Sequence, residues 1–232
     1  MCVVTYFPAN NGFYFTSNRD EVNTRQTDYP KAYKHQQYEI IYPKDLEKGG
    51  SWFAIDASQK KMACLLNATG KQPSQDDRIS RRKLPINFLI KEKSLLQEDT
   101  LKKVAPFTLI CIQYTDNVII EEYHWDGESI KLSYINEKKP YLWCSNTLYS
   151  TEEKDRLTKM FKGNLTKIKS LTDIVDFHKK MAQPLRNDVF LKKDKDLQTL
   201  SVTSLRATNK KGIISYSNLL ENSTRVLMTV NQ

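Results

Sequence analysis

The chain has few of the residues from which metal, redox and nucleotide sites are usually built. Its 232 residues include only four cysteines, three histidines and seven glycines. No two cysteines have the Cys-x-x-Cys spacing of zinc and redox motifs, and the three histidines lie far apart in the sequence. No glycine-rich phosphate loop occurs either. These absences argue against a metal centre, a nucleotide site and a Ser-His-Asp triad.

Long apolar runs are also missing. No charged and then apolar leader opens the chain, and no apolar run approaches the length of about 20 residues that a membrane helix needs. Cys64, Cys111 and Cys144 each lie in a short apolar run, where a free cysteine behaves as a small buried hydrophobe. We therefore expect no membrane span and a location in the reducing cytoplasm.

Acidic residues are fewer than basic ones, 27 against 36, which gives a net charge of +9. Most of the lysines are scattered, as on an ordinary solvated surface. The densest basic cluster comprises Arg78, Arg81, Arg82 and Lys83. It could bind a phosphate or an anionic substrate, but an exposed helix start is the simpler interpretation. Because no nucleic-acid-binding motif accompanies the charge, we expect no nucleic-acid partner.

The most informative segment is the first twenty-one residues. A β-prone run, 3–7, is followed by the turn signal 8–12 and by a second run, 13–17. Two such runs joined by a turn that contains Asn-Gly predict a hairpin. Its second strand leads back toward Cys2 and ends in Asn-Arg-Asp-Glu, residues 18–21. The hairpin should therefore bring Arg19 and Asp20 close to the Cys2 sulfur.

This arrangement suits a nucleophile. A guanidinium beside a thiol favours the thiolate, which is the reactive form. Cysteine is small enough behind Met1 for the methionine to be removed. The new α-amine of Cys2, with an ordinary pKa of about 7.7–8.0, could then act as the base. The sequence predicts Cys2 as the nucleophile, assisted by Arg19 and Asp20.

The rest of the chain is mostly predicted as strands, among them residues 107–114 and 130–135. Two helical blocks, at residues 78–104 and 152–181, interrupt them, and the second includes a helix over residues 171–181. Residues 22–37 are polar and are expected to form a long loop beside the site. The length and the 39% content of hydrophobic residues suit one large domain over residues 1–232. Strands, then helices, then strands favour a layered α+β fold.

Two of the strand-like runs end in asparagine. Residues 62–67 end at Asn67, and residues 141–146 end at Ser145 and Asn146, just before a helix that begins near Ser150 or Thr151. An asparagine at a strand end is often only a turn residue, and that alternative stays open for both. Residues 49–52 contain a Gly-Gly pair before a serine and a tryptophan, and the pair allows a close approach of backbones.

Together, Met-Cys, the hairpin, Asn-Arg-Asp-Glu, Gly-Gly-x-Trp and the strand–Ser-Asn–helix junction resemble the NRDE family, also called the TANGO2 (transport and Golgi organisation 2) family. This resemblance implies a four-layer αββα sandwich of antiparallel sheets, as in N-terminal nucleophile (Ntn) hydrolases. It also implies that Cys2 attacks the amide bond of a small molecule, that Asp20 orients the α-amine, and that Asn67 and Asn146 hold the oxyanion. Arg19 would stabilise charge near the sulfur.

One feature departs from the family pattern. The resemblance implies a Ser/Thr-rich strand with an arginine just ahead of it, whereas here Arg206 follows the serines and threonines of residues 201–204. The NRDE family has also been associated with a non-catalytic role in trafficking or in haem handling. The amidase hypothesis requires no cofactor, whereas the alternative would make haem a partner.

Overall fold

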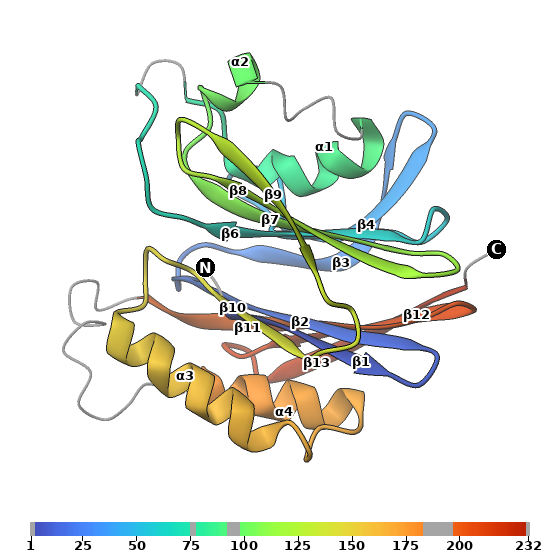
Figure 1. The fold of residues 1–232 in the computed structure, drawn as a ribbon. Coiled ribbons are helices and arrows are strands. Elements are labelled where there is room, and N and C mark those ends of the chain that lie inside the picture. Colours follow the sequence, from blue (N-terminus) through green and yellow to red (C-terminus); the bar gives the residue numbers. More distant parts are fainter. Residues whose placement is uncertain (1–2, 75–77, 92–97, 183–196, 231–232) are drawn as a thin grey trace. The chain divides into compact units, whose positions relative to one another are not determined.

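The computed structural model describes residues 3–74, 78–91, 98–182 and 197–230, which form two antiparallel sheets with helices (Figure 1). The protein is therefore of the α+β class, as predicted. The chain divides into two compact units. Unit 1 comprises Met1–Arg25 and Lys138–Thr229, and unit 2 comprises Gln26–Glu137 and Val230–Gln232.

Unit 1 contains a six-stranded sheet in the order β10-β1-β2-β11-β12-β13. Two hairpins that are far apart in the sequence meet at its centre, where β2 pairs with β11. This pairing fixes the face to which each residue of β2 points. The strands are β1 (Val3–Ala9), β2 (Gly12–Val22), β10 (Tyr141–Cys144), β11 (Leu197–Thr208), β12 (Lys211–Asn218) and β13 (Ser223–Val230).

Two helices, α3 (Thr151–Asn164) and α4 (Leu171–Met181), lie on one face of this sheet (Figure 1). The Ser150 side chain caps α3 by accepting from the Glu153 backbone N–H, and Ser170 forms a capping box with Asp173 on α4. Apolar residues of both helices pack against Val3 and Phe7 of β1. The predicted start of the first helix and the bounds of the second are confirmed.

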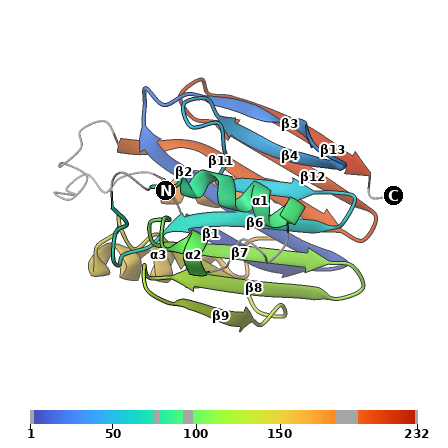
Figure 2. The ribbon, with the colours of Figure 1, turned by 90° about the horizontal axis from the view of Figure 1, so that it is seen from above.

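Unit 2 contains a seven-stranded sheet in which the strands follow sequence order, β3-β4-β5-β6-β7-β8-β9. Helix α1 (Leu84–Lys91) lies over β4, β5 and β6 (Figure 2). A short 3₁₀ helix, η1 (Arg81–Lys83), precedes α1, and α2 (Glu98–Leu101) follows it. The strands are β3 (Thr27–His35), β4 (Tyr38–Asp45), β5 (Phe53–Asp56), β6 (Lys61–Asn67), β7 (Phe107–Tyr114), β8 (Val118–Trp125) and β9 (Ile130–Ile135).

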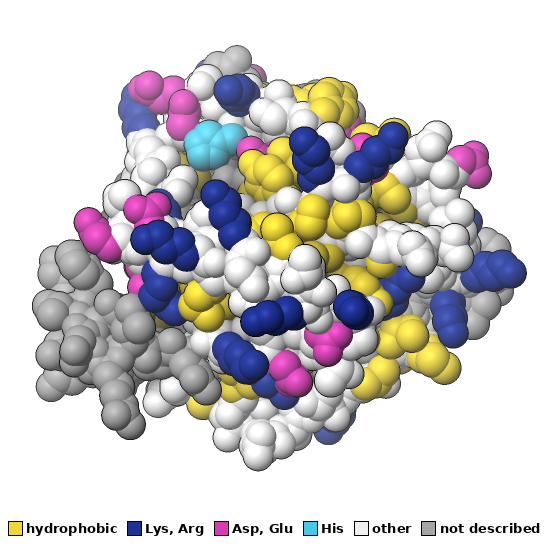
Figure 3. Space-filling view, turned by 60° about the horizontal axis from the view of Figure 1, so that its bottom comes forward, with side chains coloured by type: hydrophobic (Ala, Val, Ile, Leu, Met, Phe, Trp, Pro, Cys, Tyr) yellow, Lys and Arg dark blue, Asp and Glu magenta, His cyan; other side chains and the backbone are white. Residues whose placement is uncertain are grey.

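Burial and surface charge agree with the composition. Cys64 and Cys111 are buried in the sheet of unit 2, as predicted. Lys and Arg side chains are dispersed over the face drawn in Figure 3 rather than gathered in one patch. Among the described residues, no helix is long and apolar enough to cross a membrane.

The expected loop at residues 22–37 is wrong, because Thr27–His35 forms strand β3. β3 is an edge strand in the described part of the sheet, where it pairs with β4, and its side chains are exposed or half-buried. Pro30 lies in the irregular part of the ladder, between Asp28 and Lys31. One side of an edge strand pairs with no neighbouring strand, so an edge strand tolerates proline and lysine. A polar composition therefore does not exclude a strand at the edge of a sheet.

The Gly-Gly segment approaches a neighbouring backbone closely, as predicted. The Ser51 backbone N–H donates to the Arg82 carbonyl oxygen over 2.8 Å, and a Cβ at Gly50 would lie 2.4 Å from that same oxygen. Gly50→Ala should therefore displace η1 from the loop and lower the free energy of unfolding by about 1–3 kcal/mol. Urea unfolding followed by circular dichroism measures this change.

Gly163, near the end of α3, is the matched control, because a Cβ there would have no atom within 4 Å. Gly163→Ala should stabilise the protein by about 0.5–1 kcal/mol through helix propensity. Equal effects of the two substitutions would show that the close approach at Gly50 has no energetic importance.

Candidate functional site

The predicted N-terminal hairpin is confirmed. β1 and β2 pair antiparallel, with Val4 opposite Ser17 and Ala9 opposite Gly12, and Asn11 adopts a positive φ of 58° in the turn. β10 pairs with the other edge of β1, with Val3 opposite Cys144. The ends of β2 and β10 thus flank the start of β1. Cys2 itself lies outside the described residues.

The Asn-Arg-Asp-Glu segment lies at the end of β2, which extends to Val22. Successive side chains of a strand point to opposite faces. Asn18 faces the side that carries α4, where it bonds His178, and Asp20 shares that side. Arg19 points to the opposite face. One short motif therefore places chemically different groups on the two sides of the sheet.

Asn18 holds a buried histidine of α4. Its side-chain oxygen Oδ1 lies 2.7 Å from Nδ1 of His178, and its Nδ2 donates to the His178 carbonyl oxygen over 3.3 Å. The latter bond makes Oδ1 the acceptor, so Nδ1 of His178 carries the proton. Nε2 then accepts from the Thr5 hydroxyl, 2.7 Å away. Burial lowers the pKa of His178 to about 3, so the ring is neutral.

Asp20 is a buried carboxylate with two hydroxyl donors. Tyr149 donates to Oδ2 over 2.5 Å, and Thr199, its partner across the β2–β11 ladder, donates to Oδ1 over 2.6 Å. A pocket of about 70 Å³ adjoins Asp20 and is also lined by Tyr149, Thr199 and Met181. The two donors fix the orientation of the carboxylate.

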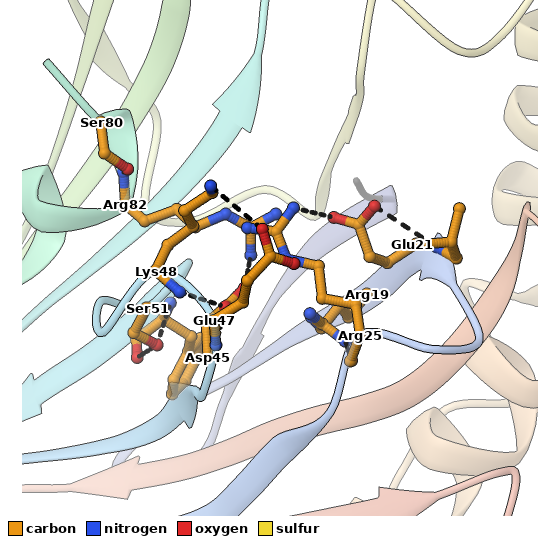
Figure 4. Close-up of polar contacts among 11 residues, drawn as sticks. Arg19, Glu21, Arg25, Asp45, Glu47, Lys48, Ser51, Ser80 and Arg82 are labelled. Atoms are coloured by element: carbon orange, nitrogen blue, oxygen red, sulfur yellow. Dashed lines mark hydrogen bonds and ion pairs between the residues drawn. The ribbon is translucent and has the colours of Figure 1, made fainter.

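Arg19 is only 2% exposed. Its Nη1 donates to the carbonyl oxygen of Arg25 over 2.9 Å, which holds the turn that follows β2. Arg25 in turn forms an ion pair with Glu21 over 3.2 Å, and the three residues are drawn in Figure 4. Arg19, for which the sequence predicted a catalytic role, therefore also has a structural contact with this turn.

Three neighbours of Arg19 complete a buried polar block on that face. In the β2–β11 ladder Ser201 pairs with Arg19, and Thr203 pairs with Ser17. All four side chains are 2% exposed or less. Neither the Ser201 nor the Thr203 hydroxyl has a hydrogen-bond partner among the described residues. We call these four residues the Arg19 block.

Asn146 follows β10 and is exposed. Its Oδ1 accepts from Nζ of Lys154 on α3 over 2.9 Å. Because an ammonium group only donates, this bond fixes which atom of the amide is the oxygen. The bond to Lys154 therefore does not use Nδ2, the donor atom that an oxyanion would require.

Asn67 is the last residue of β6 in unit 2, where it pairs with Phe107 of β7 and is half-buried. The other described candidate residues, Arg19, Asp20 and Asn146, all belong to unit 1. The backbone N–H of Ala68, the next residue, donates to the Pro106 carbonyl oxygen over 3.2 Å. This bond holds the backbone in place directly after Asn67.

Arg206 has a structural role in this protein. Its guanidinium donates to the carbonyl oxygens of Asn10 and Ala207, over 2.7 and 2.6 Å, and lies 4.9 Å from the centre of the Tyr14 ring. These contacts fasten the β1–β2 turn, which lies at the opposite end of β2 from Arg19 and Asp20. Arg206 therefore does not supply the arginine that the family pattern led us to expect.

Cys144 is half-buried, beside β1. Burial raises the pKa of its thiol to about 12, and Asp20 and Glu153 act in the same direction although Lys154 opposes them. At neutral pH this thiol is protonated and poorly nucleophilic. Cys144 is thus a natural internal control for any cysteine chemistry at Cys2.

The basic cluster of residues 78–83 is less available than its charge suggested. Arg82 forms an ion pair with the fully buried Asp45, drawn in Figure 4, and Arg81 donates to the Pro106 carbonyl oxygen over 2.5 Å. Burial and the neighbouring arginines lower the pKa of Arg81 to about 10. Two of the four cations therefore stabilise unit 2 internally.

Comparison with protein families identifies this chain. Residues 1–225 match the family described as Transport and Golgi organisation 2. The match covers nearly the whole chain, so the protein belongs to the TANGO2 family, as the resemblance indicated. None of the curated proteins matches the sequence.

Proposed function

We propose that this protein is an N-terminal nucleophile amidase in which Cys2 attacks the carbon–nitrogen amide bond of a small molecule. The observation that supports this most is the position of β1, whose start is flanked by the ends of β2 and β10. In the β1–β2 register Val4 pairs with Ser17, and Arg19 lies two residues further along β2 on the same face as Ser17. The proposal includes the stacking of the two sheets into the αββα sandwich of Ntn hydrolases.

The proposed first step begins after removal of Met1. The Cys2 sulfur bonds to the carbonyl carbon of the amide, and the free α-amine takes the thiol proton. Collapse of the tetrahedral intermediate breaks the carbon–nitrogen bond, and the α-ammonium returns the proton to the leaving amine. Water then hydrolyses the thioester, which releases the acid and restores the thiol.

Each neighbouring residue has an assigned task. Arg19 favours the thiolate by its charge. The Asp20 carboxylate, oriented by Tyr149 and Thr199, positions the α-amine. Donation to the developing oxyanion is a large catalytic contribution, and the proposal assigns it to Asn67 and Asn146. Nδ2 of Asn146 suits this task, because the bond to Lys154 uses only the oxygen of the amide.

The test is amide cleavage by the full-length protein on a panel of fluorogenic acyl amides, beside Cys2→Ala and Cys144→Ala. We expect turnover by the native chain, turnover within about twofold of native in Cys144→Ala, and none in Cys2→Ala. Equal activity of the native chain and Cys2→Ala would exclude Cys2 as the nucleophile. No turnover of any amide would favour the non-catalytic alternative.

A further inference from the structure

The Arg19 block contains two hydroxyls whose burial needs an explanation. Ser201 is 1% exposed and Thr203 is 0% exposed, and neither hydroxyl has a hydrogen-bond partner among the described residues. A buried hydroxyl without a partner is unfavourable, and native structures contain few of them. Valine has nearly the shape of threonine, and alanine is serine without its hydroxyl. Packing alone therefore does not require hydroxyls at 201 and 203.

On the other face of the sheet, hydroxyls of β11, β2 and β1 have hydrogen-bond partners. The Ser204 and Thr16 hydroxyls lie 2.8 Å apart and bond to one another, and Thr5 bonds His178. The two hydroxyls of β11 that lack a partner among the described residues thus lie on the face of the sheet to which Arg19 points. This asymmetry points to a ligand on that face.

The chemistry of the block selects the kind of ligand. Ser201 is the cross-strand partner of Arg19, and directly opposed side chains have Cβ atoms about 4.5–5.5 Å apart. Two hydroxyl donors and an arginine on one face of the sheet form a set that matches a carboxylate, because hydrogen bonds to an ionised acceptor are the stronger ones. A neutral carbonyl group would not use the charge of Arg19.

We propose that the Ser201 and Thr203 hydroxyls, with the adjacent Arg19 charge, bind a carboxylate of the substrate. The protein would then act on amides that carry a carboxylate, such as N-acyl amino acids. This assignment of substrate rests on the proposed function.

The test measures binding to the full-length Cys2→Ala protein, which cannot turn over its ligand. The probes are N-hexanoylglycine and N-hexanoylglycinamide, which differ only in the carboxylate, and calorimetry gives their dissociation constants. We expect the acid to bind about tenfold more tightly than the amide. Adding Ser201→Ala and Thr203→Val should reduce this preference to less than about twofold.

Thermal unfolding separates binding from folding. Because the two hydroxyls lack partners, the melting temperature of the Ser201→Ala, Thr203→Val protein should be unchanged or higher. Ser204→Ala is the matched control: it should lower the melting temperature, because it leaves Thr16 without its partner, and preserve the preference for the acid. A retained preference in the Ser201→Ala, Thr203→Val protein would overturn the proposal. Equal binding of both probes to Cys2→Ala, or binding of neither probe, would also overturn the proposal.

The binding test of the carboxylate site can succeed or fail independently of amidase activity. A preference for the acid in Cys2→Ala, together with an unreactive Cys2 in the native chain, would leave the carboxylate site standing and remove the amidase proposal. Amide cleavage without a preference for the acid would remove only the carboxylate site.

Discussion

Acidification from pH 7 to pH 5 is expected to cost the folded protein about 2 kcal/mol through His178 alone. Burial lowers the pKa of this histidine to about 3 in the folded chain, whereas an unfolded histidine has a pKa of about 6.5. The unfolded chain therefore binds a proton that the folded chain excludes. The stabilisation is present in full above about pH 6.5 and is lost as the pH falls toward 3.

His178→Gln is the variant that isolates this effect, because glutamine can donate and accept hydrogen bonds but does not titrate in this range. Urea unfolding at pH 7 and pH 5 should show a larger loss in the native chain than in the variant, by about 2 kcal/mol. The other histidines are common to both proteins and cancel in the comparison. NMR of the imidazole provides a second measurement. A His178 ring that titrates near pH 6.5 in the folded protein would refute the account.

Arg19→Met is expected to slow the modification of Cys2 at pH 7 by about tenfold or more. Loss of the guanidinium removes the charge that favours the thiolate, so the pKa of the Cys2 thiol should rise. The rate of alkylation by iodoacetamide, followed from pH 5 to pH 10, measures this shift. Arg19→Lys keeps a positive charge and should recover part of the rate.

The pH midpoint distinguishes an electrostatic effect from a loss of folding. Arg19→Met also removes the bond to the Arg25 carbonyl, so some loss of stability is expected in any case. A destabilised site would lower the amount of reactive protein without moving the midpoint. The same midpoint in the native chain and in Arg19→Met would show that Arg19 does not activate the thiol.

The local elements of this protein were largely predictable. The strands Phe107–Tyr114 and Ile130–Ile135 and the helix Leu171–Met181 have the expected bounds, because hydrophobic periodicity and capping residues mark them clearly. Edge strand β3 was missed, because an edge strand buries little and its sequence looks like a loop.

The partners of the site residues were not predictable. Asn18 bonds His178 across 160 positions, and Asp20 bonds Thr199 across 179. Such contacts depend on the pairing of β2 with β11 and on which face of the unit 1 sheet the helices cover. Neither follows from the local sequence pattern. For the same reason the role of Arg206 in fastening a turn was not apparent. The sequence shows that residues 201–204 are rich in serine and threonine, but not which of their hydroxyls lack a partner among the described residues.

Cys2 is tested as the nucleophile most directly by the intact mass of the purified protein before and after reaction with a cysteine-directed acylating probe. We expect a chain that lacks Met1 and gains a single adduct, with no adduct in Cys2→Ala. Cys144→Ala should leave the adduct in place. A chain that retains Met1 and forms no adduct specific to Cys2 would exclude Cys2 as the nucleophile and favour a role in binding or trafficking.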